Sequence, residues 1–378
     1  MNKDVSPSFN TYFGVLEDPR IERHKLYPLM EVLFVVLCGS ICGAESWRDY
    51  VLFGKEKIDF LSEHYSFVNG IPSKNTFARV MAALDPEAFK HCFIGWVKEL
   101  QKVMNSVIAI DGKTLRNSMN KVAGTSAIHM VSAFATDARL VLAQQKVDEK
   151  SNEITAIPKL LNLLDLKGQI ITIDAMGTQK AIAKQIIDQG GDYVLALKGN
   201  QGTLDQDVRL FLETELKKNA PKMIKDSYEE ADKGHGRIEM RKCIVSSQID
   251  WLNQKEQWVG LKTIAMIEET REKSGIKSTE CRFFISSLPA DAKQISSAVR
   301  AHWLIENGLH WSLDVVFNED KSRVRKDHAP ENMALIRHIT VNMLNNTKKL
   351  HKNVGLKALR KKAGWGNETL RSILSQNF

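Results

Sequence analysis

The chain has 378 residues, of which 43% are hydrophobic and 26% charged, a composition typical of globular proteins that excludes a fibrous or disordered chain. Its 53 lysines and arginines exceed its 45 aspartates and glutamates, and the net charge of +8 favours a polyanionic partner. The five cysteines are scattered without a C-x-x-C pair, which argues against a disulfide framework or zinc site and fits a reducing cytoplasm.

Residues 1–104 predict a helical N-terminal domain. Apolar residues recur every three and four positions in the stretches 26–44, 47–65 and 75–104. The N-terminus lacks the apolar segment of a signal peptide, and the longest apolar stretch, 30–44, is shorter than the roughly 20 residues that a membrane span requires. We therefore expect that stretch to be a buried helix, with Cys38 and Cys42 in the core.

From residue 107 the pattern changes to short strands. The strand "VIAID" at 107–111 is followed by two apolar runs, 127–134 and 139–147, which are joined by the turn "ATDA". Helical and strand patterns then alternate as helix 154–166, strand 169–174, helix 178–191 and strand 193–199. This order predicts a mixed α/β sheet, in which an antiparallel meander is continued by parallel strands with helices packed on it.

Residues 200 to about 290 predict a β-rich insertion, because three strand-like runs follow a polar helix. The helical pattern resumes after Asp291, a plausible N-cap, and continues to about residue 350. The last part, 351–378, is predicted as a basic C-terminal tail, and the run from 348 to 362 contains seven lysines or arginines and no acid. Such a run is a candidate DNA-binding element, with a solvated face as the alternative.

Two apolar strands end in aspartate, at Asp111 and at Asp174. If the two strand ends lie side by side, their carboxylates repel each other unless a cation lies between them. Oxygen ligands of this kind suit Mg²⁺ or Mn²⁺. The alternative for either residue alone is that it begins a turn, which aspartate favours. "GKT" is not a phosphate-binding P-loop, because the glycine that the loop requires is replaced by Val107.

A third acidic residue is expected from the helix at 291–311. Ile295, Val299, His302, Glu306 and Leu309 fall on one stripe, so Glu306 is predicted to face the sheet, where a buried carboxylate needs a cation as its partner. The alternative is a position at the edge of the stripe and a pair with a lysine or arginine. Three other acids compete for the same role, namely Asp314, Glu319 and Asp320.

The chain resembles the H-repeat-associated family of bacterial insertion-sequence transposases, which belong to the DDE superfamily. Six motifs carry the resemblance in this order: "AIDGKTLR", "SNEITAIPKLL", "TIDAMGTQ", "ALKGNQG", "HGRIEMR" and "HWLIENGLHWSLDVVFNED". The N-terminal motifs "FGVLEDPR", "CGAESW" and "GIPSKNTFARV" resemble the domain associated with that family. The resemblance covers nearly the whole chain.

This resemblance implies a ribonuclease-H-like catalytic core at 105–350, interrupted by the β-rich insertion. It implies that Asp111, Asp174 and Glu306 form a DDE triad that binds two Mg²⁺ (or Mn²⁺) ions, and that the chain cuts DNA at element ends and transfers strands. The implied partners are double-stranded DNA, as inverted-repeat ends and target, and a second copy of the chain in a homodimer on DNA. No membrane partner is expected, and the protein is expected in the cytoplasm, associated with the nucleoid when bound to DNA.

The sequence departs from more distant relatives of that family around the glutamate. Those relatives carry Tyr, Arg and Lys at the positions of Val299, His302 and Leu313, so the phosphate-binding roles of that Arg and Lys are not implied here. Other residues are candidate DNA contacts, with a solvated loop or face as the alternative. They are Lys198, Asn200, His235, Arg237, Arg241, His302, Arg323 and Arg325.

We therefore expect a metal-dependent DNA transposase. Two alternatives remain open: a catalytically inert, transposase-derived DNA-binding protein, and a two-metal nuclease that acts on another phosphodiester. The intact triad argues against the first alternative, and the order of the motifs argues against the second.

Overall fold

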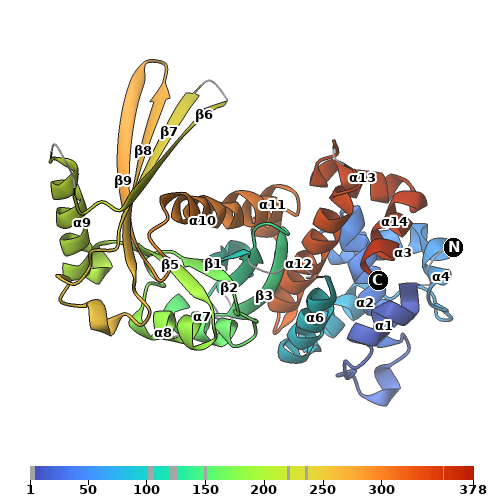
Figure 1. Cartoon of the computed structure of the whole chain (residues 1–378). Coiled ribbons are helices and arrows are strands. Elements are labelled where there is room, and N and C mark those ends of the chain that lie inside the picture. Colours follow the sequence, from blue (N-terminus) through green and yellow to red (C-terminus); the bar gives the residue numbers. More distant parts are fainter. Residues whose placement is uncertain are drawn as a thin grey trace.

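The computed structural model describes residues 5–100, 106–119, 124, 126–148, 151–218, 222–234, 237–351 and 353–378. Figure 1 shows a sheet-centred part on the left and a group of helices on the right, with both chain termini in the helical group. A long helix, α12 (Ala329–Lys348), lies at the junction between the two parts.

The sheet has nine strands in the order β3-β2-β1-β4-β5-β9-β8-β7-β6. Their bounds are β1 Val107–Leu115, β2 Ile128–Ala135, β3 Leu140–Lys146, β4 Ile170–Ile173, β5 Asp192–Leu197, β6 Asp226–Gly234, β7 Arg237–Ser246, β8 Thr263–Lys273 and β9 Ile276–Ser286. The first three strands form an antiparallel meander, and β1, β4 and β5 run parallel. The predicted mixed α/β sheet with a ribonuclease-H-like arrangement is thus confirmed.

Helices cover both faces of this sheet. Between its parallel strands run α7 (Glu153–Leu161) and α8 (Lys180–Asp188), and after β5 comes α9 (Thr203–Leu216). On the other face lies α10 (Ala292–Leu304), whose predicted N-cap Asp291 accepts a hydrogen bond from the N–H of Gln294 at 2.8 Å. The strands β6–β9 follow α9 and form an antiparallel meander that joins the sheet through the β5–β9 pair. In Figure 1 these strands rise above α10.

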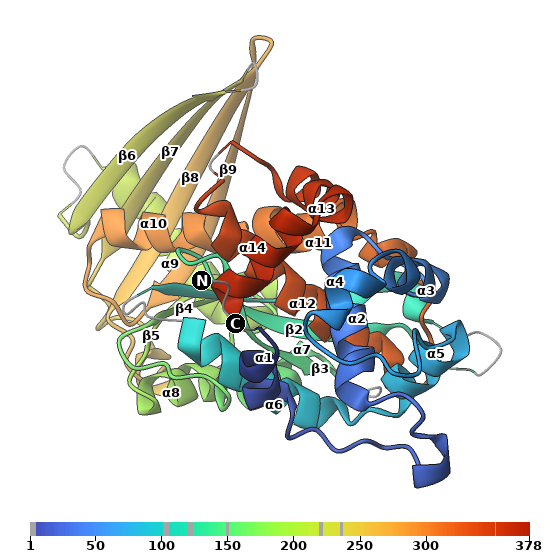
Figure 2. The same cartoon turned by 90° about the vertical axis from the view of Figure 1, so that its right-hand side faces the viewer.

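The helical group contains helices from both ends of the chain. From the N-terminal end come α1 Val5–Phe13, α2 Leu29–Cys42, α3 Trp47–Glu56, α4 Ile58–Ser62, α5 Lys74–Ala83 and α6 Pro86–Leu100. From the C-terminal end come α12, α13 (Leu356–Trp365) and α14 (Asn367–Asn377), which lie against α2 and α6 (Figure 2). The indole N–H of Trp96 donates to the carbonyl of Asn377 at 2.9 Å. The division of the chain at residues 104 and 350 therefore remains a proposal, since the last 28 residues pack into the N-terminal group.

The apolar helix α2 is almost entirely buried, and Cys38 within it has no exposed surface. Within the described residues, no single helix is long and apolar enough to cross a bilayer. Together α2 and α3 reach that length and composition, but the chain bends by 95° between them.

Helix α12 joins the two parts through buried amide side chains. The Asn332 amide donates to the carbonyls of Met81 and Leu84, both at 2.9 Å, in the helical group. The Asn342 side chain accepts from the N–H of Val141 at 2.7 Å and donates to its carbonyl at 2.8 Å, in strand β3. Because a buried amide without partners costs about 1–3 kcal/mol, these bonds specify how the helices seat on the sheet.

Acid should destabilise the protein through His338, which lies on α12 with 3% of its surface exposed. Burial lowers the pKa of its imidazole to about 3, whereas the unfolded chain protonates near 6.5. Stability should therefore fall as the pH drops from 6.5 towards 3, by roughly 1.4 kcal/mol per pH unit for this one group. Urea unfolding at pH 7, 6 and 5 measures this, and His338→Leu should show a shallower loss. An equal pH dependence in the two proteins would contradict the assignment.

Candidate active site

Asp111 lies in the middle of β1, not at its end. The predicted strand end at residue 111 is wrong, because β1 continues to Leu115 through its antiparallel pairing with β2, where Asp111 lies opposite Ser132. The parallel pairing with β4, however, stops at Ile110 opposite Ile173. Asp111 and Asp174 are the next residues on the two chains, so the register of β1 and β4 places them side by side at the end of the parallel ladder.

Asp174 begins the turn after β4. One of its carboxylate oxygens accepts the backbone N–H groups of Met176 and Gly177, each at 3.1 Å. The Asn200 amide donates to the carbonyl of Ala175 at 2.7 Å and so supports the same turn. Asp174 thus stabilises a turn, which was the alternative role expected for it, and also lies beside Asp111. Asn200, a predicted DNA contact, uses its side chain to support the same turn.

Glu306 lies where α10 passes into a π-helical turn, η5 (Ile305–His310), which is followed by α11 (Trp311–Val315). The predicted burial of Glu306 against the sheet is wrong. Its side chain is exposed, whereas its neighbours Ile305 and Leu309 are buried. The prediction assumed 3.6 residues per turn throughout, and a π-turn changes the phase of the stripe. π-helical turns of this kind are frequent at functional sites.

A cleft of about 570 Å³ contains all three acids. We call it the carboxylate cleft, and its lining includes Asp111, Asp174 and Glu306 together with Lys198, Arg282 and Trp303. Strands β1, β4, β5 and β9 and helix α10 contribute to its walls. The carboxylates therefore line one space from three distant segments of the chain, and cations line it as well.

Asp111 is the most perturbed acid of the cleft. Burial is the main cause that raises the pKa of its carboxyl to about 7, and the negative charges of Glu153, Asp174 and Glu306 raise it further. The N–H of Gly112, which donates to Asp111 at 2.9 Å, acts in the opposite direction. A buried acid among other acids is an arrangement that a bound cation would relieve, and such perturbed groups concentrate at functional sites.

The three acids that compete with Glu306 for the third position surround a lysine instead. Lys113, two residues after Asp111, has its ammonium 2.7 Å from Asp314, 3.5 Å from Glu319 and 3.3 Å from Asp320. Arg337 of α12 lies 3.3 Å from Glu319 as well. Since these carboxylates already have cations as partners and do not line the carboxylate cleft, the geometry favours Glu306.

Glu153, the first residue of α7, is an acidic neighbour that the sequence analysis missed. Its carboxylate is 2.6 Å from the Nε2 of His129, whose Nδ1 lies 2.8 Å from the Thr114 hydroxyl. Only a glycine fits between this pair and Asp111, because a Cβ on Gly112 would lie 2.1 Å from the Glu153 oxygen. The signal in the sequence was the motif "SNEITAIPKLL", in which Glu153 occupies a helix start.

Two histidines flank the acids as neutral groups. His310 Nδ1 lies 3.5 Å from Asp111, and burial, helped by the charge of Lys113, lowers its pKa to about 4. His302, predicted as a DNA contact, lines the carboxylate cleft with its Nδ1 3.0 Å from the Thr172 hydroxyl, and burial lowers its pKa. Neither imidazole therefore supplies a positive charge at neutral pH.

The donor set fits a hard divalent cation, since Asp111, Asp174 and Glu306 present only carboxylate oxygens. The negative charges of Glu153, Asp174 and Glu306 around Asp111 also fit a bound cation, because a cation would reduce their mutual repulsion. Within the described residues, however, no three histidine, cysteine or acidic side chains are close enough to share one metal ion. A bound ion would therefore require the carboxylates to approach one another.

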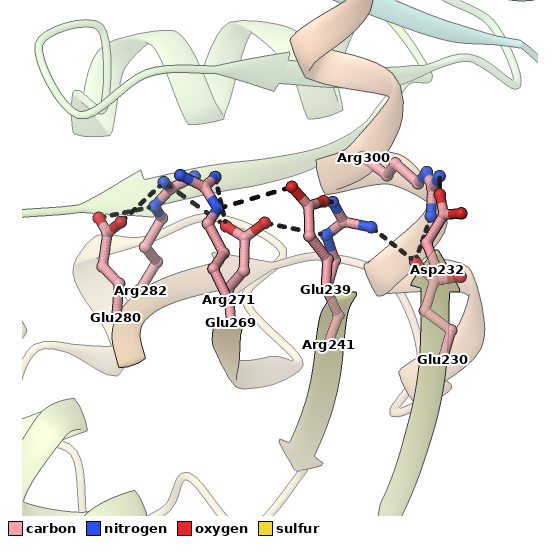
Figure 3. Close-up of polar contacts among 9 residues, drawn as sticks. All are labelled: Glu230, Asp232, Glu239, Arg241, Glu269, Arg271, Glu280, Arg282 and Arg300. Carbon is pink, nitrogen blue, oxygen red and sulfur yellow. Dashed lines mark hydrogen bonds and ion pairs between the residues drawn. The ribbon is translucent and has the colours of Figure 1, made fainter. Parts of the chain in front are cut away.

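The predicted DNA contact Arg241 belongs to a network of ion pairs on the insertion, which we call the ion-pair ladder (Figure 3). Arg241 lies opposite Glu230 on β6 and Glu269 on β8, and its guanidinium is 2.5 Å from Glu239. Four arginines and five acids form the ladder: Arg241, Arg271, Arg282, Arg300, Glu230, Asp232, Glu239, Glu269 and Glu280. Each arginine has at least two acidic partners within 4 Å, so the positive charge of each is compensated by acids.

The remaining predicted DNA contacts lie in different places. Lys198 is exposed on the wall of the carboxylate cleft. Arg323 and Arg325 are exposed near η6 (Glu319–Lys321), where Arg325 donates to the carbonyl of Asn117 at 2.9 Å. His235 and the side chain of Arg237 lie outside the described part of the chain. The structure thus brings Lys198 and His302 to the acids and leaves Arg323 and Arg325 apart from them.

Residues 103–343 match the family described as Transposase DDE domain, and residues 10–97 match the one described as DDE_Tnp_1-associated. The "H repeat-associated putative transposase YhhI" of Escherichia coli (strain K12) is 42% identical over 370 residues, 96% of this chain and 97% of that protein. The "Putative transposase YncI" of Escherichia coli O157:H7 is 42% identical over 96% of this chain and 93% of its own length. The "Inactive transposase YbfQ" of strain K12 is 35% identical over 71 residues, 19% of this chain and 84% of that protein.

The family match spans more than half of the chain, and the first two relatives align with nearly all of it. The six sequence motifs and the ribonuclease-H-like order of strands agree with that match. The chain therefore belongs to the DDE transposase family, with the H-repeat type of associated domain at its N-terminus.

Proposed function

We propose that the protein is an active transposase that cuts DNA at the ends of an insertion sequence and joins those ends to target DNA. The observation that carries the proposal is the partly buried Asp111, which lies among three other carboxylates beside an open cleft and whose pKa is raised to about 7. Carboxylates gathered in this way lower the stability of the folded protein. A role in holding cations next to a phosphodiester would explain why the chain keeps them. Membership of the DDE transposase family supports the same reaction class.

Asp111, Asp174 and Glu306 are the residues proposed to hold the divalent ions, two Mg²⁺ or Mn²⁺, that family members generally use. When bound, such ions supply the charge that activates water or a DNA 3′-hydroxyl and that stabilises the departing oxygen. The chain itself positions these acids: the β1–β4 register aligns Asp111 with Asp174, and the π-turn directs Glu306 to the cleft. Lys198, which is exposed and lines the same cleft, is proposed to bind DNA phosphates.

The proposed partners are double-stranded DNA with inverted-repeat ends and a target duplex. Since two ends must be joined in one event, we propose that the protein acts as a homodimer on DNA, in the cytoplasm and at the nucleoid. The inactive relative named above makes an inert DNA-binding descendant the main rival, and the complete triad of this chain argues against it.

Loss of either acid should abolish cleavage. We expect purified protein with Mg²⁺ to nick DNA at the flanking inverted repeats, and Asp111→Asn and Glu306→Gln to lower the rate at least about 1,000-fold. Asp148→Asn is the matched control, because Asp148 carries the same charge at an exposed position paired with Lys159. Equal cutting by the two variants and the parent would show that the triad is misassigned. Binding without cutting by the parent, across several divalent metals, would favour the inert descendant.

Asp111→Asn should stabilise the metal-free protein. The folded-state pKa of Asp111 lies near 7 and the unfolded value near 4, so its charge opposes folding increasingly from pH 4 to pH 7 and constantly above pH 7. In EDTA at pH 8 we expect the variant to be more stable by on the order of 1–3 kcal/mol, and less so at pH 4. Adding Mg²⁺ should stabilise the parent alone. Thermal unfolding of both proteins measures this, and a less stable variant at pH 8 in EDTA would refute the charge argument.

Gly112→Ala should disturb the acids without removing any of them. Its Cβ would meet the Glu153 oxygen at 2.1 Å and the His129 Nε2 at 2.5 Å, so that pair must move away from Asp111. We expect cleavage to fall by at least about tenfold, while the melting temperature changes by only a few degrees. Gly95→Ala is the control, because its Cβ would meet nothing within 4 Å. Normal cleavage by Gly112→Ala would show that the position of Glu153 is unimportant.

A further inference from the structure

The four arginines of the ion-pair ladder already lie among acids (Figure 3). Three other cations gather elsewhere without such partners. Arg139 in the turn between β2 and β3, Lys348 at the end of α12 and Lys357 at the start of α13 line one hollow. Within the described part of the chain, none of the three has a carboxylate within 4 Å, and no acid lines the hollow.

We call this hollow the basic pocket, and its volume is about 440 Å³. Its floor is apolar and includes Phe134 and Val316, while Trp311 of α11 stands at its wall with 55% of its surface exposed. Lys357 is the second residue of α13, whose first turn contains no acid and whose N-cap Gly355 provides no side-chain cap. The free N–H groups of that turn add partial positive charge to the three cations.

The basic pocket is continuous with the carboxylate cleft along α10 and η5. Trp303 lines both the carboxylate cleft and a middle hollow of about 400 Å³ beneath the ion-pair ladder. Leu304 and Asn307 line both that middle hollow and the basic pocket. The three hollows therefore follow one helical path from Glu306 to Trp311, with the acids at one end and the unpaired cations at the other.

We propose that the basic pocket binds an unpaired nucleotide of a DNA strand that extends from the carboxylate cleft. The three cations suit the strand's phosphates, and the exposed Trp311 ring suits stacking with a base. A pocket of this volume admits one nucleotide, whereas a base-paired duplex, which is about 20 Å wide, cannot enter it. The proposal rests on the proposed function, because it takes the carboxylate cleft as the place where DNA is cut.

The experiment compares two double variants of the full chain in their binding to a single-stranded oligonucleotide. Lys348→Ala with Lys357→Ala removes two pocket cations. Lys361→Ala with Lys362→Ala removes the same charge from exposed positions of α13 outside the pocket. The slope of log affinity against log salt should fall in magnitude by about 1.4 for the pocket variant, since each phosphate contact contributes about 0.7 for a single strand. The control variant should keep the slope of the parent.

A third variant, Trp311→Ala, tests the stacking. We expect it to weaken binding of the single strand about fivefold or more and to leave binding of a blunt duplex unchanged. Far-UV circular dichroism and the melting temperature show whether each variant is folded. Gly308→Glu tests the pocket without removing a cation. The site has room for the new side chain, because a Cβ at Gly308 would meet only the Phe134 ring at 4.0 Å. This substitution should place an acid in the pocket and reduce binding of the single strand.

Equal slopes for the pocket and control variants would overturn the inference, as would equal loss of duplex and single-strand binding in Trp311→Ala. These outcomes differ from a failure of the proposed function. If the parent cuts element ends and the pocket variants bind as the control does, the activity stands and the pocket assignment is wrong. If the pocket variants lose single-strand binding but the parent cuts nothing with any metal, the pocket assignment stands and the activity is wrong.

Discussion

The structure depends on the parallel register of β1 and β4, because that register places Asp111 and Asp174 next to each other. Two partly buried carboxylates at neighbouring positions raise the free energy of the folded chain unless a cation lies between them. The surrounding elements maintain this costly arrangement. The meander β1–β3 holds Asp111 in a continuous strand, the turn after β4 holds Asp174 through backbone N–H groups, and Gly112 leaves space for Glu153.

Elsewhere the chain pairs its charges closely. Lys113 lies between Asp314 of α11 and Asp320 of η6, and the four arginines of the ion-pair ladder each lie among glutamates or aspartates. Two hollows in the described part of the chain differ from this pattern. Excess negative charge surrounds Asp111 in the carboxylate cleft, and excess positive charge surrounds Trp311 in the basic pocket. A divalent cation would compensate the acids of the carboxylate cleft, and the phosphates of a DNA strand would compensate the cations of the basic pocket. The helical segment from Glu306 to Trp311 connects the two hollows.

Much of the fold followed from local patterns. The change from helical spacing to short apolar runs at Val107 predicted the mixed sheet, and the N-cap at Asp291 began α10 as expected. The errors arose where tertiary contacts override local periodicity. Antiparallel pairing with β2 extended β1 beyond Asp111, and the π-turn moved Glu306 to an exposed position. Arg241 looked available in the sequence, but cross-strand register places Glu230 and Glu269 opposite it.

The sequence by itself determined the family, the order of strands and helices and the acids that could form a site, because these depend on residue types and spacings within single segments. Only the tertiary structure decided which acids share a cleft. Asp314, Glu319 and Asp320 form ion pairs with Lys113, whereas Glu306 lines the cleft with Asp111 and Asp174. The fold also places Glu153 next to Gly112 and so near Asp111. The reason is that the pKa and the ion pairs of a charged side chain depend on the groups that lie near it in space. These groups come from strands and helices that are far apart in the chain.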